Sequence, residues 1–166
     1  MDITVKQAET DDEIRGKAYV HWAAWHEAYT DLISKAYLDK LTLEKCTEIA
    51  YQWPDNILIA KDGERVVGFV GYGGPREEPS NAGVIFALYV LKDYYGTGVG
   101  RRLLEAGLAH LTAYPTVCLW VLKENRRAIR FYEKCGFHAT GEEKVLPLLE
   151  AAEIRMVWER TETDAK

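Results

Sequence analysis

The feature that most constrains this chain is a glycine-rich turn between an apolar run and a helical stretch. The apolar run covers 84–91, and Leu103, Leu104 and Leu108 keep helical spacing after the turn. Glycine lets a backbone approach a bulky anion closely, because no Cβ atom stands in the way. The N–H groups and the dipole of the helix's first turn then favour negative charge. The sequence therefore predicts a phosphate-binding turn made of Tyr95, Gly96, Thr97, Gly98, Val99, Gly100 and Arg101.

Two common phosphate-binding patterns do not match this turn. A Walker A loop requires Gly-Lys-Ser/Thr after four spacer residues, and the sequence contains no such string. A dinucleotide-binding fingerprint that started at Gly96 would need glycine where Arg101 stands, and no acidic residue ends a following strand. Taken alone, the glycines also fit a structural role, in which they only let the helix and the strand pack closely.

The first half of the chain contains both extended and helical patterns. A short alternating strand is expected at 3–7, a helix opens at Asp11, and a second helical segment runs over 34–51. The Asp-Gly pair within 62–64 predicts the turn of a β-hairpin. Its strands are Ile57–Lys61 and Arg65–Tyr72, and a loop is expected over 73–81.

The second half contains two apolar runs that are typical of strands buried on both faces, 84–91 and 117–122. Asn125 is a favourable N-cap for a helix that ends at Cys135, and Gly136 stands where a left-handed residue terminates a helix. Two further strands are expected, near His138–Val145 and Ile154–Glu159. With no linker or repeat, the order βααβββαβαββ predicts a mixed α/β fold in a single domain, 1–166.

Composition excludes several classes of protein. The formal net charge is -5, which argues against a nucleic-acid partner, because binding to a phosphate backbone favours a basic surface. The start of the chain lacks a signal-peptide pattern and no apolar run is long enough for a membrane span, so the sequence predicts a cytoplasmic protein without a membrane partner. The three cysteines form no CxxC pair, and the four histidines lack metal-ligand spacing, so no metal is expected.

Two strings of the sequence together resemble the GNAT superfamily of N-acetyltransferases. The signature Q/R-x-x-G-x-G/A corresponds to Tyr95–Gly100, and N-x-x-A-x-x-F-Y-x-x-x-G-F corresponds to Asn125–Phe137. The strings and the strands before them cover Val84–Phe137. The resemblance implies a mixed sheet of about seven strands flanked by about four helices, with a splay between strands 4 and 5 that holds coenzyme A.

The same resemblance implies how acetyl-coenzyme A would bind. Its pantetheine arm would pair with the backbone of Leu88, Tyr89 and Val90, and its pyrophosphate would lie on Tyr95–Gly100. Asn125 would contact the pantetheine or hold the start of its helix. Tyr95 departs from the family's Gln or Arg, so the missing side-chain contact is expected from Arg101 or Arg102, and Arg126 or Arg127 could reach the 3′-phosphate.

The resemblance also implies direct attack of an amine on the thioester, without an acyl-enzyme. Tyr132 matches the family tyrosine that protonates the leaving thiolate, although a buried core aromatic would occur in the same pattern. The glutamate that many relatives carry on the fourth strand is replaced by Val84. The general base is therefore unassigned, with His26, Glu27, Asp31 or a water chain as candidates.

The expected acceptor is the primary amine of a small molecule. Trp22, Trp25 and Tyr29 lie at helical spacing in a region that roofs the acceptor pocket in the family, and ordinary core packing explains such spacing equally. Trp120 replaces a glutamate of ribosomal-protein acetyltransferases, which argues against a peptide acceptor. The alternatives are a protein or peptide N-acetyltransferase and a non-catalytic acyl-coenzyme A sensor. Family members commonly form homodimers, so a second copy is a further candidate partner.

Overall fold

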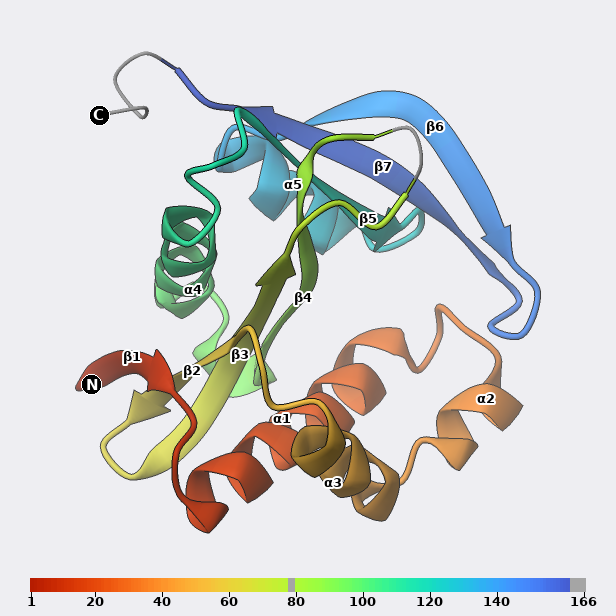
Figure 1. Cartoon of the computed structure of the whole chain (residues 1–166). Coiled ribbons are helices and arrows are strands. Elements are labelled where there is room, and N and C mark those ends of the chain that lie inside the picture. The colour runs from red at the N-terminus through yellow and green to blue at the C-terminus, as the bar shows by residue number, and fades with distance from the viewer. Residues whose placement is uncertain (78–79, 162–166) are drawn as a thin grey trace.

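The computed structural model describes residues 1–77 and 80–161. It contains one seven-stranded mixed sheet, as the family resemblance implies, and its strands lie in the order β1-β2-β3-β4-β5-β7-β6 (Figure 1). The strands are β1 (Ile3–Gln7), β2 (Ile57–Asp62), β3 (Arg65–Gly73), β4 (Gly83–Val90), β5 (Thr116–Leu122), β6 (His138–Leu146) and β7 (Ala151–Glu159). The helices are α1 (Asp11–Tyr29), α2 (Lys35–Lys40), α3 (Leu43–Gln52), α4 (Val99–Ala109) and α5 (Arg126–Lys134), with a 3₁₀ turn, η1 (Lys92–Tyr94), before α4.

The predicted single helix over 34–51 is wrong, because the structure contains two helices there. The chain leaves helical geometry at Leu41 (ψ 86°) and Thr42 (ψ 161°). The Thr42 hydroxyl accepts a hydrogen bond from the Lys45 N–H at 3.1 Å and so begins α3 as its N-cap. The observed order therefore has three helices between β1 and β2 instead of two. Of the loop expected over 73–81, residues 78–79 lie outside the described residues, and β3 extends to Gly73.

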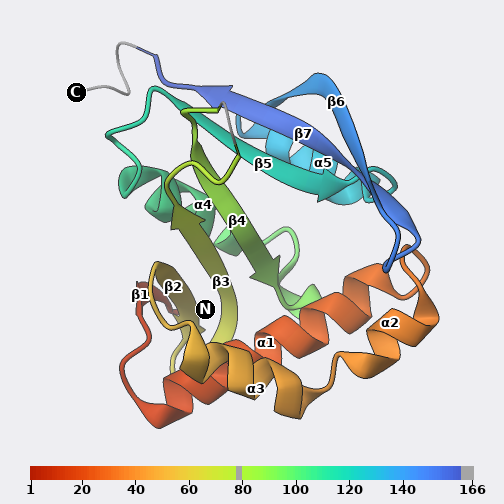
Figure 2. The same cartoon turned by 45° about the vertical axis from the view of Figure 1, so that its right-hand side comes forward.

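The sheet consists of two antiparallel halves joined by one short parallel contact. β1 to β4 form the first half, and β5, β7 and β6 form the second. β4 and β5 pair only at Gly83↔Val117 and Val84↔Cys118. The two strands then diverge, which is visible in both cartoon views (Figures 1 and 2). The divergence opens the middle of the sheet at one end.

Neighbouring residues of β3 show which helices cover which face. The Val70 side chain packs against Gly107 of α4, whereas the ammonium of Lys17 in α1 lies 4.5 Å from the ring centroid of Phe69. Because successive strand residues point to opposite faces, α4 and α1 cover opposite faces of the sheet. α5 lies beside α4, since the Phe131 ring is 3.4 Å from the place of a Cβ atom on Gly100.

The strand predicted over 84–91 is buried on both faces only at its start. Gly83, Val84 and Ile85 are buried, whereas the residues from Phe86 to Val90 are partly exposed. The difference arises where β5 moves away, because a strand without a neighbour keeps one edge and part of each face open. The apolar run therefore reflects a core strand in its first half and the wall of an opening in its second.

The buried carboxylate of Glu13 fixes the start of α1 against the sheet. Lys6 of β1 and Lys61 of β2 donate to its Oε2 atom at 2.7 and 3.0 Å, and the Thr10 N–H donates to its Oε1 atom at 3.2 Å. The hydrogen bond from Lys6, together with the others, holds the pKa of Glu13 well below its ordinary value. This site thus belongs to the architecture and lies away from the opening.

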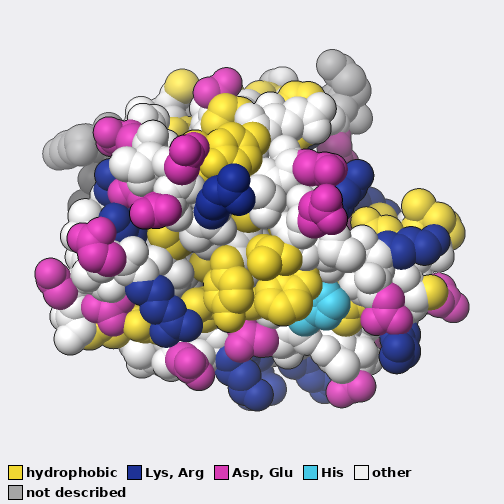
Figure 3. All heavy atoms as spheres, turned by 90° about the horizontal axis from the view of Figure 1, so that it is seen from below, with side chains coloured by type: hydrophobic (Ala, Val, Ile, Leu, Met, Phe, Trp, Pro, Cys, Tyr) yellow, Lys and Arg dark blue, Asp and Glu magenta, His cyan; other side chains and the backbone are white. Residues whose placement is uncertain are grey.

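Figure 3 shows the face formed by the helices at the bottom of Figure 1, where hydrophobic side chains gather near the centre and charged ones surround them. The exposed large hydrophobic residues of α1 and α3 are Tyr19, Leu43 and Tyr51.

In the part of the chain that the structure describes, no helix has the length and apolar character that a membrane span requires.

Candidate active site

The divergence of β4 and β5 creates a cavity of about 520 Å³. One wall is the edge of β4 from Ile85 to Val90, which has no β5 partner in the described residues. An unpaired strand edge presents a row of backbone N–H and C=O groups that favour an extended partner. The cavity can therefore accept a chain-like ligand that pairs with β4.

A β-bulge in β4 sets the direction of this strand edge. Tyr72 pairs with Ile85 and Gly71 pairs with Ala87, so Phe86 is an extra residue in β4. A Cβ atom on Gly71 would lie 2.4 Å from the Phe86 ring, so this ring position requires glycine there. Bulges re-aim side chains beside binding sites, and this one places Phe86 and Tyr89 in the cavity wall.

The glycine turn closes one end of the cavity. Gly96 and Gly98 have φ angles of 75° and 91°, which only glycine adopts without strain. Gly98 is also the N-cap of α4, and it has no side chain to accept hydrogen bonds from the first-turn N–H groups. Gly96, Gly98 and Gly100 all line the cavity, so the start of α4 offers an anion site at its edge.

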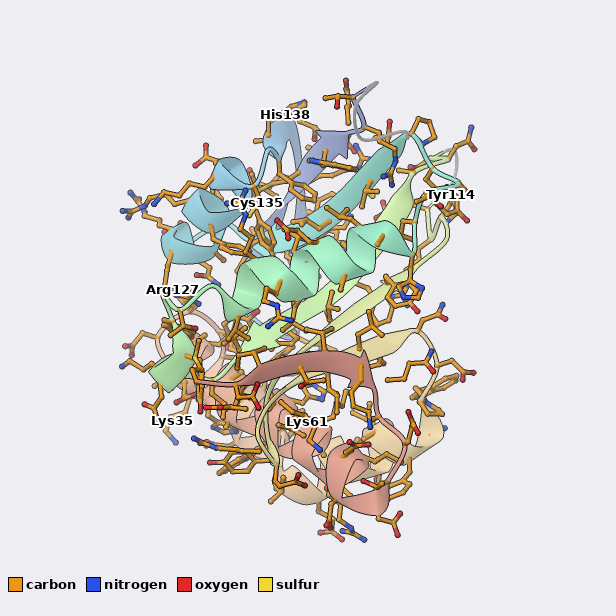
Figure 4. All side chains as sticks on the ribbon, turned by 90° about the vertical axis from the view of Figure 1, so that its left-hand side faces the viewer. Lys35, Lys61, Tyr114, Arg127, Cys135 and His138 are labelled. Atoms are coloured by element: carbon orange, nitrogen blue, oxygen red, sulfur yellow. The ribbon has the colours of Figure 1, made fainter. Side chains whose placement is uncertain are left out.

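The positive charge at the turn comes mainly from α5. The guanidinium carbon of Arg127 lies 3.8 Å from the ring centroid of Tyr95, and both residues line the cavity. Figure 4 shows Arg127 near the start of α4, with Tyr114 at the opposite end of that helix. Arg101 also lines the cavity while it pairs with Glu105 at 3.2 Å.

The prediction that Arg102 could supply charge to the turn is not supported by the geometry. Its guanidinium donates to the Ile3 carbonyl oxygen of β1 at 2.8 Å, and its side chain does not line the cavity. At the position where the resemblance implies Gln or Arg, the ring of Tyr95 instead packs against the guanidinium of Arg127.

The backbone of α5 fixes the position of Tyr132. The Asn125 side chain accepts a hydrogen bond from the Ala128 N–H at 3.3 Å and begins the helix. At the other end, Gly136 has a φ of 97°, and the Phe137 N–H donates to the Tyr132 carbonyl oxygen at 3.0 Å. This Schellman arrangement includes contact between the two rings, whose centroids are 5.7 Å apart.

Tyr132 is buried, yet it lines the cavity. Burial raises the pKa of its phenol above the ordinary value, and the nearby phenol of Tyr89 acts in the same direction. The group therefore stays protonated across the physiological range and can donate a hydrogen bond or a proton into the cavity.

Aromatic side chains of α1 and β4 line the side of the cavity opposite to α5. The rings of Trp25 and Tyr29 lie 4.8 Å apart, and each also contacts the Tyr89 ring. Burial raises the pKa values of both Tyr29 and Tyr89. Trp22 lies outside the cavity, where it contacts Tyr19 and His26.

Glu153 supplies the one carboxylate among the described residues that line this cavity. Trp158 of β7 packs against Phe137 after α5, so strand alternation places Glu153 on the opposite face, toward α1. Burial raises the pKa of this carboxyl, and the Lys144 ammonium, 3.9 Å away, acts against that shift. A carboxylate with a raised pKa in a cavity is a candidate proton acceptor.

None of the side chains that the sequence suggested as a base lines the cavity. His26 Nε2 is 3.0 Å from the Leu41 carbonyl oxygen, Glu27 accepts a hydrogen bond from the Lys92 N–H, and Asp31 is exposed. Sequence reasoning missed Glu153, because acidic residues are common on exposed strand faces. Its position directly after Ala151 and Ala152, in a largely apolar stretch, was the available signal.

The structure brings most of the predicted site residues together. Thr97 and Val99 are the exceptions: the Thr97 hydroxyl donates to the Tyr94 carbonyl oxygen at 2.6 Å, and the Val99 side chain is buried in the core. Among the residues that the structure describes, no group of three His, Cys, Asp or Glu side chains is arranged to hold a metal ion. The predicted residues that line the cavity are Leu88, Tyr89, Val90, Tyr95, Gly96, Gly98, Gly100, Arg101, Asn125 and Tyr132.

Comparison with known proteins decides the family. The model of the acetyltransferase (GNAT) family matches residues 18–137. The chain is 30% identical over 139 residues to the uncharacterized N-acetyltransferase YuaI of Bacillus subtilis, with 79% of this chain and 78% of that protein covered. This chain belongs to the GNAT acetyltransferase family.

Two further similarities extend over most of this acetyltransferase. It is 28% identical over 149 residues to a probable spermine N(1)-acetyltransferase of Bacillus subtilis subsp. natto, covering 86% of this chain and 91% of that protein. The fold matches the PaiA N-acetyltransferase of Thermoplasma acidophilum, crystallised with coenzyme A, with a TM-score of 0.73, 18% identity and coverage of 96% and 99%. The chain is accordingly an acyltransferase of the N-acetyltransferase type with the GNAT fold.

The glycine turn gives a first testable prediction. Alanine at position 98 would have to adopt a φ of 91°, so we expect Gly98→Ala to shift the turn. If this strain of about 1–2 kcal/mol is lost from the binding free energy, acetyl-coenzyme A should bind roughly tenfold more weakly. Titration calorimetry measures this affinity.

Gly141→Ala is the matched control, since Gly141 has a φ of 93° in β6 and does not line the cavity. It should show the same backbone strain without a change in coenzyme affinity. Equal losses of affinity in the two variants would contradict a specific role for the turn.

Proposed function

We propose that this enzyme transfers the acetyl group of acetyl-coenzyme A to the primary amine of a small molecule by direct attack. The observation that carries the proposal is the content of one cavity: an unpaired strand edge, an anion-binding turn, a protonated phenol and a carboxylate. Residues 1–166 would act as one acetyltransferase domain.

The cavity walls fit coenzyme A. Backbone groups at Leu88–Val90 would hold the pantetheine arm, because this edge of β4 lacks a strand partner. The first-turn N–H groups after Gly98 would hold the pyrophosphate, and Arg127 and Arg101 would neutralise it. Asn125 holds the start of α5 beside the same ligand.

The bound thioester supplies an acetyl carbon that is open to nucleophilic attack. Glu153 would accept a proton from the incoming amine, whose nitrogen then bonds to that carbon as the carbon–sulfur bond breaks. Tyr132 would give its phenol proton to the departing sulfur and regain one from solvent. The products are an amide and a free thiol, and no side chain becomes acylated.

The aromatic walls favour a small acceptor over a long peptide. Trp25, Tyr29 and Tyr89 enclose the acceptor side, and the Trp120 indole donates to the Glu77 carboxylate beside it. The probable spermine acetyltransferase among the relatives is named for a small amine, which supports the same class. The alternatives are a peptide acceptor and a non-catalytic sensor, and activity measurements separate them from a small-molecule acceptor.

The first test is amine-dependent release of coenzyme A thiol, together with the variant Tyr132→Phe. We expect release in the presence of small amines and roughly a hundredfold lower kcat in the variant, because the leaving thiolate loses its proton donor. The affinity for acetyl-coenzyme A should be retained, since phenylalanine keeps the contacts of the ring with Phe131 and Phe137.

Tyr114→Phe is the control, because Tyr114 lies outside the cavity. Full activity of Tyr132→Phe would exclude the proposed proton donor. Binding of acetyl-coenzyme A without thiol release for any amine or peptide would favour the sensor, and release with peptides alone would favour the peptide acetyltransferase.

Glu153 gives a prediction on pH dependence. Only the ionised carboxylate accepts a proton, and burial raises its pKa above the ordinary value of 4.5. The rate of the wild type should therefore fall as the pH drops through that raised pKa. We expect Glu153→Gln to lower kcat/KM by roughly a hundredfold and to lose this acidic limb of the profile.

Glu143→Gln provides the control on the neighbouring strand, since Glu143 pairs with Lys123 at 3.1 Å and does not line the cavity. An unchanged acidic limb in Glu153→Gln would show that another group accepts the proton.

A further inference from the structure

A second cavity, of about 540 Å³, lies between α1 and the α1-facing side of β3 and β4. It shares four wall residues with the first cavity, Trp25, Phe86, Ala87 and Tyr89. The two cavities therefore adjoin at the β4 bulge. Trp25 and Tyr89 line both cavities, so a ligand that extended from the second cavity into the first would contact both rings.

Lys17 is the unusual residue of this second cavity. It lies on α1 with 6% of its surface exposed, and none of the ion pairs in the described chain includes it. Its ammonium lies 4.5 Å from the ring centroid of Phe69, which stabilises a cation without neutralising it. A buried charge without a counterion is costly, and burial accordingly lowers the pKa of Lys17, so an anion brought by a ligand would stabilise the ammonium form.

His21 follows Lys17 by one helical turn and lines the same cavity. Its Nδ1 atom is buried and has no hydrogen-bond partner in the described structure. Burial, and then the charge of Lys17, lower the pKa of His21 to about 4, so the imidazole is neutral near pH 7. The two side chains thus offer one positive charge and one unused neutral hydrogen-bonding atom.

The other charged groups lie at the edge of the cavity. Arg76 and Asp55 both line it and both are exposed, and the Arg76 guanidinium lies 4.0 Å from the Phe86 ring centroid. Their opposite charges leave Lys17 as the buried net charge. A single ammonium matches a monoanion, and the walls around it are aromatic: Trp25, Trp53, Phe69, Phe86 and Tyr89.

We infer that this enzyme's acceptor is an amino carboxylate with an apolar portion, whose carboxylate binds Lys17 and His21 in the second cavity while its amine points past Tyr89 toward Glu153. The inference rests on the proposed function and narrows its substrate class. The apolar portion packs against the aromatic walls. The Lys17 charge also disfavours a polyamine, because a second ammonium of the acceptor would lie close to it.

The test compares acceptors that differ only by a carboxylate: phenylalanine with 2-phenylethylamine, leucine with 3-methylbutylamine, and ornithine with putrescine. Acetyl transfer is followed by thiol release for the wild type and for Lys17→Met, which keeps a long apolar stem without the charge. We expect the acid of at least one apolar pair to have the higher kcat/KM in the wild type. The ratio of acid to amine should fall about tenfold to a hundredfold in Lys17→Met, as expected for a lost charged hydrogen bond.

Lys40→Met is the matched control, since Lys40 is exposed at the end of α2 and lines neither cavity. It removes the same charge and should leave the ratio unchanged. Thermal unfolding of the free protein provides a structural control. Lys17→Met should unfold at the same or a higher temperature, because it removes a buried unpaired charge.

A binding measurement decides the inference without turnover. The acids should raise the unfolding temperature of the wild type more than their decarboxylated partners do, and Lys17→Met should lose this difference. Equal stabilisation by acid and amine, or a preference for the amine in the wild type, would overturn the anion site. Absence of turnover with every amine, combined with acid-specific stabilisation, would instead contradict the proposed function and leave the site in place.

Discussion

Parallel pairing between β4 and β5 ends after two residue pairs, and the rest of the site depends on that early end. A continuous sheet would satisfy the β4 edge with β5, so no groove would remain. The opening instead leaves backbone donors and acceptors of Ile85–Val90 facing a cavity. The same divergence places α4 and α5 side by side, so the glycine turn and Tyr132 line one cavity with the β4 edge.

Local signals in the sequence predict most of the fold, because each has a local physical cause. The Asp-Gly hairpin, the Asn125 cap and the terminal glycine at 136 are set by a few neighbouring residues, and the structure has all three. The break at Leu41–Thr42 was missed, since a threonine N-cap within a continuous helical pattern has no strong breaker beside it.

The part of the candidate site that consists of backbone could be predicted from the sequence. The side chains that depend on which way a strand or helix faces could not. The glycines of the turn are visible in the sequence, and the structure gives two of them, Gly96 and Gly98, positive φ angles. The side of the sheet on which Glu153 lies depends on the register of β7 beside β5. Whether Lys17 has an ion-pair partner depends on the residues against which α1 packs. Both are long-range facts that periodicity does not contain. The partly buried carboxylate of Glu153 and the buried ammonium of Lys17 therefore emerged only from the structure.

We propose that coenzyme A completes the β4 edge and binds the start of α4. Hydrogen exchange of the backbone amides, followed by mass spectrometry with and without acetyl-coenzyme A, tests it most directly. Exchange should slow in the segments 87–90 and 98–101, while α3 (Leu43–Gln52), which packs against α1 and does not line the first cavity, stays unchanged. Binding of acetyl-coenzyme A with unaltered exchange in both segments would contradict the account.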